Sequence, residues 1–244
     1  MKTLKAVFFD LDDTLYSTSE FAARARRASV DAMVAQGVRM TPEDLFRELE
    51  EVIAEFTSNY EHHFDKLLLR IPPSTWEGVN RAVLIAAAVV GYHETKSRDL
   101  APWPDAMEFL GGLARTSLIR GIITSGLEIK QAEKLLRLRV LPFLSPGGLF
   151  ISDQIGISKP NVKLYLRACE AMGVLPAEAM YVGDHPTHDI DPANEIGMTT
   201  VLVRRGGRHG RGEGKTAAAH EIRDFAELRR ILSAGYGIEV PPAV

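Results

Sequence analysis

Residues 7–16, with the sequence VFFDLDDTLY, place three carboxylates directly after an apolar run that is typical of a buried strand. Carboxylates that lie close together repel one another, and each is costly to remove from water unless it finds a partner. A cluster of this kind at the end of a core strand therefore predicts a cation, or a reaction that uses the negative charge. The partners must come from other parts of the chain.

The composition is that of a globular protein in which neither sign of charge dominates. The 244 residues are 45% hydrophobic and 25% charged, with a formal net charge of -3, which argues against a general binder of nucleic acid or membrane surfaces. Cys169 is the one cysteine. It cannot form an intramolecular disulfide, and its apolar helical surroundings predict a buried structural thiol. We expect a cytoplasmic protein without a targeting or membrane-spanning segment, either a monomer or a homodimer.

Short strand-like runs recur along the chain, and helical patterns separate them. The runs lie at residues 4–9, 119–124, 148–153, 179–182 and 199–203. Nearly continuous apolar strands that alternate with helices predict a parallel sheet covered on both faces. The expected fold class is therefore α/β, with a Rossmann-like three-layer core, and ligands bind such sheets beyond the carboxyl ends of the strands.

Residues 17–100 interrupt this alternation with helical patterns alone. The sequence predicts two domains: an α/β core of residues 1–16 and 101–244, and a helical domain of residues 17–100 inserted after the first strand. Within the insertion, the pair Ser74 and Glu77 has the spacing of a capping box before a long helix.

Three further parts of the insertion carry expectations. Ser17 with Glu20 has capping-box spacing, and Thr41 precedes a first-turn proline, as at the start of a helix. A stripe at helical spacing is expected in the core of the insertion or in a subunit contact: Val79, Val83, Ala86, Ala87 and Val90.

The glycine- and arginine-rich stretch of residues 204–215 is the one segment of biased composition. It could be a nucleic-acid arm or a phosphate-binding nest. A surface loop is favoured, because the stretch lacks interleaved aromatic residues and the whole chain is slightly acidic.

Four polar motifs follow one another along the core part of the sequence, and most lie at or just after a predicted strand end. They are Asp10-x-Asp12-x-Thr14, Thr124-Ser125, Lys159 in GISKPN, and Gly183-Asp184 with Asp189. Because parallel strands end at one edge of a sheet, these residues can converge there. Carboxylate oxygens suit Mg²⁺, while Lys159 and the Thr124 hydroxyl suit the oxygens of a phosphoryl group. The motifs together predict a metal and phosphate site.

The ordered set DLDDT, IITS, SKPN and GDHPTHD resembles the haloacid dehalogenase (HAD) superfamily in its phosphatase branch, and the insertion is similar to the small helical (C1-type) cap of that superfamily. The resemblance implies a Mg²⁺-dependent phosphatase that acts on a small phosphate ester through an aspartyl-phosphate intermediate. It implies that Asp10 is the nucleophile and also a ligand of the metal. It also implies that Asp12 is the general acid and then the general base, and that the main-chain carbonyl of Asp12 ligates the metal.

The same resemblance implies roles for the later motifs. Thr124 and Lys159 would hold the phosphoryl oxygens, and Ser125, which stands where relatives often carry asparagine or aspartate, would contact the substrate. Asp184 would ligate Mg²⁺ directly, and Asp189 would ligate the metal or brace its ligands.

Other polar residues near the motifs have simpler interpretations. Asp13 is read as a turn and capping residue, and Thr14 as a residue that holds the loop. His185 and His188 are read as loop residues. In the insertion, Asn59 and His63 are the predicted substrate-binding residues, in a polar stretch that also contains His62 and Arg70.

Three alternatives remain beside the phosphatase. A haloacid dehalogenase would use the aspartate nucleophile and lysine, but halide departure needs neither a metal nor an acid. A sugar-phosphate mutase would differ only in where the phosphoryl group goes next. A non-catalytic phosphate-binding protein is the alternative from another class.

Overall fold

The computed structural model of the protein describes residues 3–205 and 212–243. Contacts divide the chain into two compact units, one formed by Met1–Ser19 with Ala101–Val244 and the other by Glu20–Leu100. All described strands belong to the first unit, which we call the core, and the second unit is helical.

The core is built on one sheet of six parallel strands, in the order β3-β2-β1-β4-β5-β6. The strands are β1 (Ala6–Phe9), β2 (Ile119–Thr124), β3 (Leu149–Ile151), β4 (Ala179–Gly183), β5 (Thr199–Val203) and β6 (His220–Ile222). The predicted α/β class with a parallel sheet is confirmed. The first five strands were predicted to within two residues at each end, whereas β6 was not predicted.

The helices and turns of the core connect these strands. They are α5 (Pro104–Leu113), α6 (Glu128–Arg137), η2 (Leu141–Phe143), α7 (Ser152–Ile155), α8 (Val162–Ala171), η3 (Pro176–Glu178), the π-helical turn η4 (Pro186–Ile190), α9 (Asp191–Glu195) and α10 (Phe225–Tyr236). Within residues 3–205 and 212–243, no helix has the length and apolar character needed to cross a membrane.

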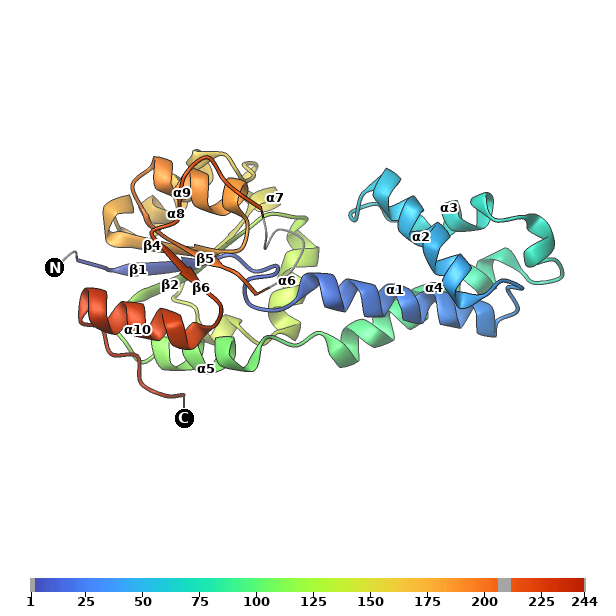
Figure 1. The fold of residues 1–244 in the computed structure, drawn as a ribbon, viewed down its shortest axis with the longest axis horizontal. Helices are drawn as coiled ribbons and strands as arrows, with labels where there is room; N and C mark the ends of the chain where they lie inside the picture. The colour runs from blue at the N-terminus through green and yellow to red at the C-terminus, as the bar shows by residue number, and fades with distance from the viewer. Residues whose placement is uncertain (1–2, 206–211, 244) are drawn as a thin grey trace. The chain divides into compact units, whose positions relative to one another are not determined.

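Successive side chains of the central strand β1 point to opposite faces of the sheet, and all of them are buried. Phe8 packs edge-on against Phe150, in a cluster that also contains α8 residues such as Tyr165. Phe9 packs against Phe109 of α5 and Phe225 of α10, at ring-centroid distances of 6.3 and 6.4 Å. Figure 1 shows α8 and α9 on one side of the sheet and α5 and α10 on the other, which makes the core a three-layer structure.

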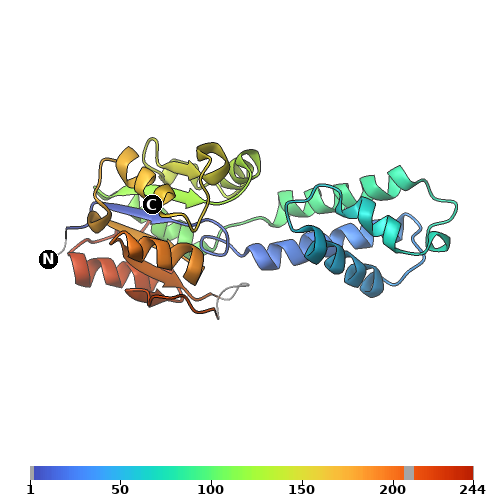
Figure 2. The same ribbon diagram turned by 90° about the horizontal axis from the view of Figure 1, so that it is seen from above.

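The helical unit has a core of its own. Its elements are α1 (Thr18–Ala35), which begins at the edge of the first unit, α2 (Pro42–Phe56), α3 (His63–Arg70), η1 (Pro73–Thr75) and α4 (Arg81–Asp99). Figure 2 shows α1 and α4 side by side. They approach closely at Gly91, where a Cβ atom would lie 2.7 Å from the carbonyl oxygen of Ala28. The buried cluster consists of Val30, Met33, Val38, Leu45, Leu49, Ile53, Leu67, Leu68, Ile71, Leu84 and Ala88.

One expectation about α4 is wrong, and another is met only in part. The helix is capped by Asn80, whose side-chain oxygen accepts a hydrogen bond from the main chain of Ala82, and not by the Ser74 and Glu77 pair, because Ser74 lies in η1. The predicted apolar stripe does not fill the core: Val83 and Val90 are 48% and 52% exposed, since Leu84 and Ala88 form the buried face. The alternative of a subunit contact stays a prediction.

The predicted cap of α2 and the predicted role of Asp13 agree with the structure, while the Ser17 and Glu20 pair stays a prediction. Thr41 caps α2 by accepting a hydrogen bond from the main chain of Asp44 at 3.1 Å. The carboxylate of Asp13, which has a positive φ of 54°, accepts hydrogen bonds from the main chain of Thr18 and Ser19 at the start of α1. Asp13 is therefore a turn and capping residue, as predicted. Cys169 is buried in α8, also as predicted.

Half of the glycine- and arginine-rich stretch cannot be compared with its prediction, because residues 206–211 lie outside the described residues. Its last part is attached to the core, where Asp191 accepts hydrogen bonds from the main chain of Lys215 and Thr216.

Candidate active site

The sheet order brings the first, second and fourth motifs to the same edge. Phe9 at the end of β1 pairs in register with Ile122 of β2 and with Val182 of β4. Asp10, Thr124 and Asp184 therefore leave the sheet next to one another, at the carboxyl ends of three adjacent strands. This edge lies where the strand order reverses, which is where open α/β sheets bind their ligands.

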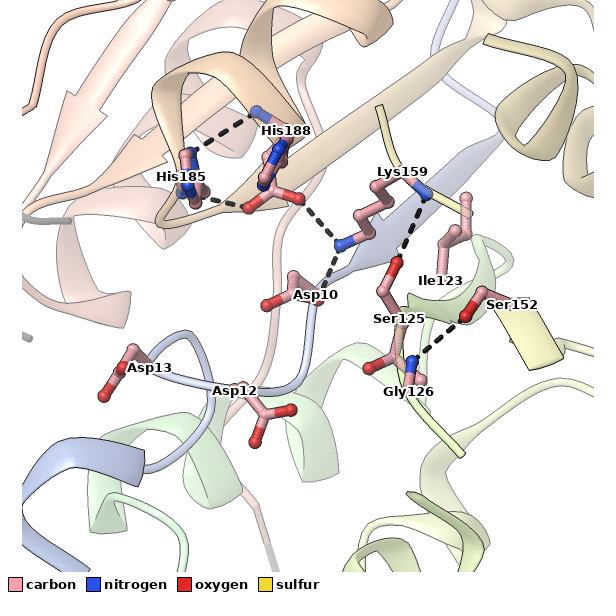
Figure 3. A network of polar contacts seen from close by, with 12 residues as sticks. Asp10, Asp12, Asp13, Ile123, Ser125, Gly126, Ser152, Lys159, His185 and His188 are labelled. Atoms are coloured by element: carbon pink, nitrogen blue, oxygen red, sulfur yellow. Dashed lines mark hydrogen bonds and ion pairs between the residues drawn. The ribbon is translucent and has the colours of Figure 1, made fainter. Parts of the chain in front are cut away.

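Three buried carboxylates meet at this edge. Oxygen atoms of Asp10, Asp184 and Asp189 lie within 4.8 Å of one another. Lys159, which precedes α8, places its ammonium group between two of them, 2.6 Å from Asp10 Oδ1 and 2.7 Å from Asp189 Oδ1 (Figure 3). Its side chain is only 6% exposed. One lysine thus faces three acids, and the cluster keeps an excess of negative charge.

Asp189 is held in place from three directions. Its Oδ2 accepts a hydrogen bond from the main chain of His185 at 3.0 Å, and its Oδ1 accepts one from the Tyr181 hydroxyl at 3.1 Å as well as the one from Lys159. The carboxylate folds back against Gly183, where any Cβ atom would lie 2.5 Å from Oδ2. A glycine is therefore required at the end of β4 for Asp189 to reach the cluster.

Burial and mutual repulsion make the carboxylates of this cluster harder to ionise. Burial raises the pKa of Asp10 to about 7, with Asp189 and Asp12 adding to the shift and Lys159 opposing it. Burial, together with the charges of Asp10 and Asp189, raises the pKa of Asp184 to about 9.

A divalent cation would fit this arrangement. Asp184 Oδ2 is buried and has no hydrogen-bond partner among residues 3–205 and 212–243. A buried oxygen without a partner, in a cluster of hard oxygen donors, is the environment that Mg²⁺ and similar cations prefer. The residues that are present therefore fit the predicted metal site.

The carboxylate of Asp12 does not join this cluster. It points away from Asp10 (Figure 3) and is surrounded by donors. Lys134 Nζ lies 2.7 and 2.9 Å from its two oxygens, Gln131 Nε2 donates to Oδ2 at 3.0 Å, and the hydroxyls of Tyr16 and Thr18 donate to Oδ1. Burial acts to raise the pKa of Asp12, but Lys134, Tyr16 and Gln131 bring it below its ordinary value.

The second motif supplies two hydroxyl groups at the same edge. Thr124 is buried, and its Oγ1 accepts a hydrogen bond from Gln131 Nε2 at 2.6 Å. Ser125 Oγ accepts hydrogen bonds from the main chain of Lys159 at 3.3 Å and from the Ser158 hydroxyl at 3.2 Å. Ser125 therefore ties the second motif to the loop that carries Lys159.

Sequence reasoning missed the residues that hold the motif side chains. Gln131 and Lys134 lie on α6, one turn apart, Tyr16 lies in the segment between β1 and α1, and Tyr181 lies on β4. The sequence offered one indication of Gln131 and Lys134: they are polar residues in the predicted helix that directly follows the Thr124-Ser125 motif. A helix with polar residues at this spacing is more often a solvated face, so the pattern alone does not distinguish them.

The remaining polar residues near the site lie in its loops. Thr14 is fully buried and its hydroxyl has no hydrogen-bond partner within the described chain. The rings of His185 and His188 lie 4.1 Å apart on η4, and the main chain of His188 donates to His185 Nδ1 at 3.4 Å. Their interpretation as loop residues stays a prediction.

The predicted substrate-binding residues of the insertion lie in the helical unit. Asn59 is exposed in the turn between α2 and α3. His63 begins α3, its Nε2 lies 2.7 Å from the carbonyl oxygen of Thr57, and its ring contacts Tyr60. Arg70 forms ion pairs within the unit, with Glu51 and Glu55.

The sheet is doubly wound and parallel, and buried carboxylates and a lysine lie at its switch point. This arrangement is typical of a class of hydrolases whose active sites lie at the carboxyl ends of the strands. Residues 4–197 match the haloacid dehalogenase-like hydrolase family. The chain belongs to this family, and the resemblance predicted from the four motifs is confirmed.

Individual relatives agree with this assignment. The chain is 45% identical to a glyceraldehyde 3-phosphate phosphatase of Methanopyrus kandleri, over 83% of this chain and 85% of the relative. It is 38% identical to a protein of the same name from Methanothermobacter thermautotrophicus, over 82% of this chain and 85% of that one. The crystal structure of a HAD phosphatase from Thermococcus onnurineus has a TM-score of 0.68 and 25% identity, and the match covers 98% of this chain and 100% of that one.

Proposed function

We propose that the protein is a metal-dependent phosphatase that hydrolyses a small phosphate monoester through an aspartyl-phosphate on Asp10. The observation that carries the proposal is the Lys159 ammonium between Asp10 and Asp189, next to the unpartnered oxygen of Asp184. A nucleophilic carboxylate needs nearby positive charge when it approaches an anionic ester, and the lysine supplies part of it.

The reaction assigns one role to each carboxylate of the first motif. An oxygen of Asp10 attacks phosphorus, the ester P–O bond breaks, and Asp12 gives a proton to the departing alkoxide. Asp12 then takes a proton from water, which attacks phosphorus and releases phosphate from Asp10. The hydroxyls of Thr124 and Ser125 and the Lys159 ammonium hold the phosphoryl oxygens during both steps.

Mg²⁺ is the cation that we propose for this site. Asp10, Asp184 and the main-chain carbonyl of Asp12 would hold it, and Asp189 would brace the cluster through Lys159. When bound, the ion neutralises phosphoryl charge and so lowers the barrier to attack by an anion. Lys159 counters only part of the charge of the three acids, which supports a requirement for a cation.

We also propose that the helical unit is a C1-type cap that selects the substrate. The boundary predicted at residues 17–100 and the compact unit Glu20–Leu100 nearly coincide, which supports an inserted module with its own core. Asn59 and His63 are the proposed contacts to the leaving group. Because close relatives bear the name glyceraldehyde 3-phosphate phosphatase, this three-carbon ester is the first substrate to test.

The alternatives fit the site less well. A dehalogenase releases halide, which needs neither the protonating group at Asp12 nor the acidic pair Asp184 and Asp189. A mutase would use the same groups and pass the phosphoryl group to a second hydroxyl. A non-catalytic phosphate-binding protein would have no need for a nucleophile beside a metal site.

The test is release of inorganic phosphate from p-nitrophenyl phosphate and a panel of metabolite phosphates, with Mg²⁺ and with chelator. We expect metal-dependent release that Asp10→Asn abolishes and Asp12→Asn strongly reduces. Release that survives Asp10→Asn would remove the proposed nucleophile. Metal-independent halide release from a haloacid would favour the dehalogenase instead.

A further inference from the structure

The helix α6 carries a buried amide that has no place in the motifs. Gln131 is 2% exposed, and a buried side-chain amide must be hydrogen-bonded to be tolerated. Its Nε2 lies 2.6 Å from Thr124 Oγ1, 3.0 Å from Asp12 Oδ2 and 3.3 Å from the main-chain oxygen of Ser125. One amide group thus connects the first motif to the second.

The direction of these hydrogen bonds follows from their partners. The carbonyl oxygen of Ser125 can only accept, so the NH₂ end of Gln131 faces this group of atoms. Thr124 Oγ1 must then accept from Gln131, because an NH₂ group only donates. The hydroxyl proton of Thr124 is left for another acceptor, and a phosphoryl oxygen at the sheet edge would be one.

The main chain leaves room for this amide at one position. Gly126 has a φ of +148°, and a Cβ atom there would lie 3.0 Å from Gln131 Cδ. Gly126, which follows the second motif, therefore lies directly against the side chain of Gln131. A larger residue at either position would displace the amide from Thr124.

The next inward-facing polar residue of α6 is Lys134, three positions along the helix. Its Nζ contacts both oxygens of Asp12, at 2.7 and 2.9 Å, and its side chain is 23% exposed. A single donor that bridges both oxygens fixes the plane of the carboxylate, as a single hydrogen bond to one oxygen would not. Residues at positions i and i+3 lie on the same face of a helix, so both contacts come from one rigid element.

We propose that Gln131 is a positioning residue: it turns the Thr124 hydroxyl into a donor for the phosphoryl group. The inference rests on the proposed phosphatase function. Gln131 also donates to Asp12, but Lys134, Tyr16 and Thr18 still hold that carboxylate when the amide is removed, so the effect of Gln131 is expected on the phosphoryl group.

The experiment compares two esters that differ in their need for an acid. p-Nitrophenolate leaves without protonation, whereas the alkoxide of glyceraldehyde 3-phosphate needs a proton. A residue that acts only on the phosphoryl group should affect both esters alike, because the two esters carry the same phosphoryl group.

Gln131→Met should lower kcat/KM about equally for the two esters, by roughly 10- to 100-fold, because both carry the same phosphoryl group. Gln131→Asn, whose amide is one methylene too short, should lose as much while keeping a polar group in the buried site. Lys163→Met removes an exposed lysine of α8 and should leave both esters unaffected.

Each result has a separate meaning. A loss in Gln131→Met that is confined to the alkyl ester would overturn the role of Gln131 at Thr124. Thermal melting identifies variants that do not fold, and wild-type kcat/KM in either folded Gln131 variant would overturn the role of Gln131. If the wild type releases phosphate from neither ester, the proposed function itself fails.

Discussion

The sheet edge and the helical unit differ in how deeply their polar side chains are buried and in how far apart in the sequence the bonded partners lie. At the sheet edge, Asp10, Lys159 and Asp189 are buried and bond to one another across long stretches of sequence. In the helical unit, the polar stretch around α3 makes local pairs near solvent, such as Arg70 with Glu55. The first arrangement depends on the topology of the whole sheet, whereas the second depends on the packing of two consecutive helices, α2 and α3.

This difference has an energetic basis that bears on function. Removing one partner of a buried ion pair costs about 3–5 kcal/mol, whereas an exposed pair contributes roughly 0–1 kcal/mol. Substitutions at the sheet edge are therefore severe, and substitutions on the surface of the helical unit are mild.

The largest effect is expected from Lys159→Met, which removes the one lysine that the structure places within the carboxylate cluster. We expect kcat/KM for p-nitrophenyl phosphate to fall by about 1000-fold or more, because charge stabilisation at phosphorus is lost and the carboxylates repel one another. Arg70→Met in the helical unit removes the same charge and should cost less than about 10-fold. Steady-state kinetics on both variants would contradict the comparison if their losses were similar.

The sequence predicted the residues whose positions the strands determine. Asp10, Thr124 and Asp184 each end a strand, so their convergence follows from strand order, and an apolar run followed by a polar residue is visible without a structure. Lys159 precedes α8, and its place came from the order of the motifs. These predictions needed no knowledge of side-chain packing.

The parts that escaped prediction depend on packing. Gln131 and Lys134 face inward because α6 lies along the site, a fact that helical periodicity does not contain. The strand β6 is three residues long and partly exposed, so it lacks the apolar run that marked the others. On α4, alanines and valines occupy every face of the helix, and only tertiary contacts select Leu84 and Ala88 for burial.

The next effect is on the stability of the metal-free protein, which should depend on pH. The pKa values of Asp10 and Asp184 are raised in the folded protein, so their contribution to stability is fully present below pH 4 and is lost as pH rises through about 7 and 9. The metal-free protein should therefore become less stable between pH 4 and pH 9 on account of these groups, and Mg²⁺ should oppose the loss.

Asp184→Asn tests this directly, because it removes one of the two groups that must ionise. We expect it to raise the melting temperature of the metal-free protein at pH 8 by about 3 °C, to abolish most of the stabilisation by Mg²⁺, and to lower kcat by about 100-fold. Asp65→Asn, which removes a partly exposed carboxylate of the helical unit that pairs with Arg81, is the control. An unchanged response to Mg²⁺ in Asp184→Asn would contradict a metal site at the sheet edge.

A smaller effect separates stability from activity at two glycines. Gly183→Ala places a Cβ atom 2.5 Å from the Asp189 carboxylate, and Gly91→Ala places one 2.7 Å from the main chain of Ala28 in the helical unit. Both variants should lose about 1–3 kcal/mol of unfolding free energy. Only Gly183→Ala should also lower kcat, by roughly 10-fold, since it displaces a member of the cluster. Urea unfolding and kinetics at 25 °C measure the two quantities, and a matching loss of kcat in Gly91→Ala would contradict the distinction.

The smallest effect is expected in the helical unit itself, at Asn59 and His63. His63 is held by Thr57 and Tyr60, so His63→Ala should alter the shape of the turn that carries Asn59. We expect Asn59→Ala and His63→Ala to raise KM for glyceraldehyde 3-phosphate by less than about 10-fold, while kcat for p-nitrophenyl phosphate stays within about 2-fold of wild type. Uniform binding of a leaving group changes KM and spares the chemical step, which is why the two substrates must be compared. If kcat for p-nitrophenyl phosphate fell as far as in Lys159→Met, the helical unit would belong to the reaction centre, and the contrast between the two regions would be wrong.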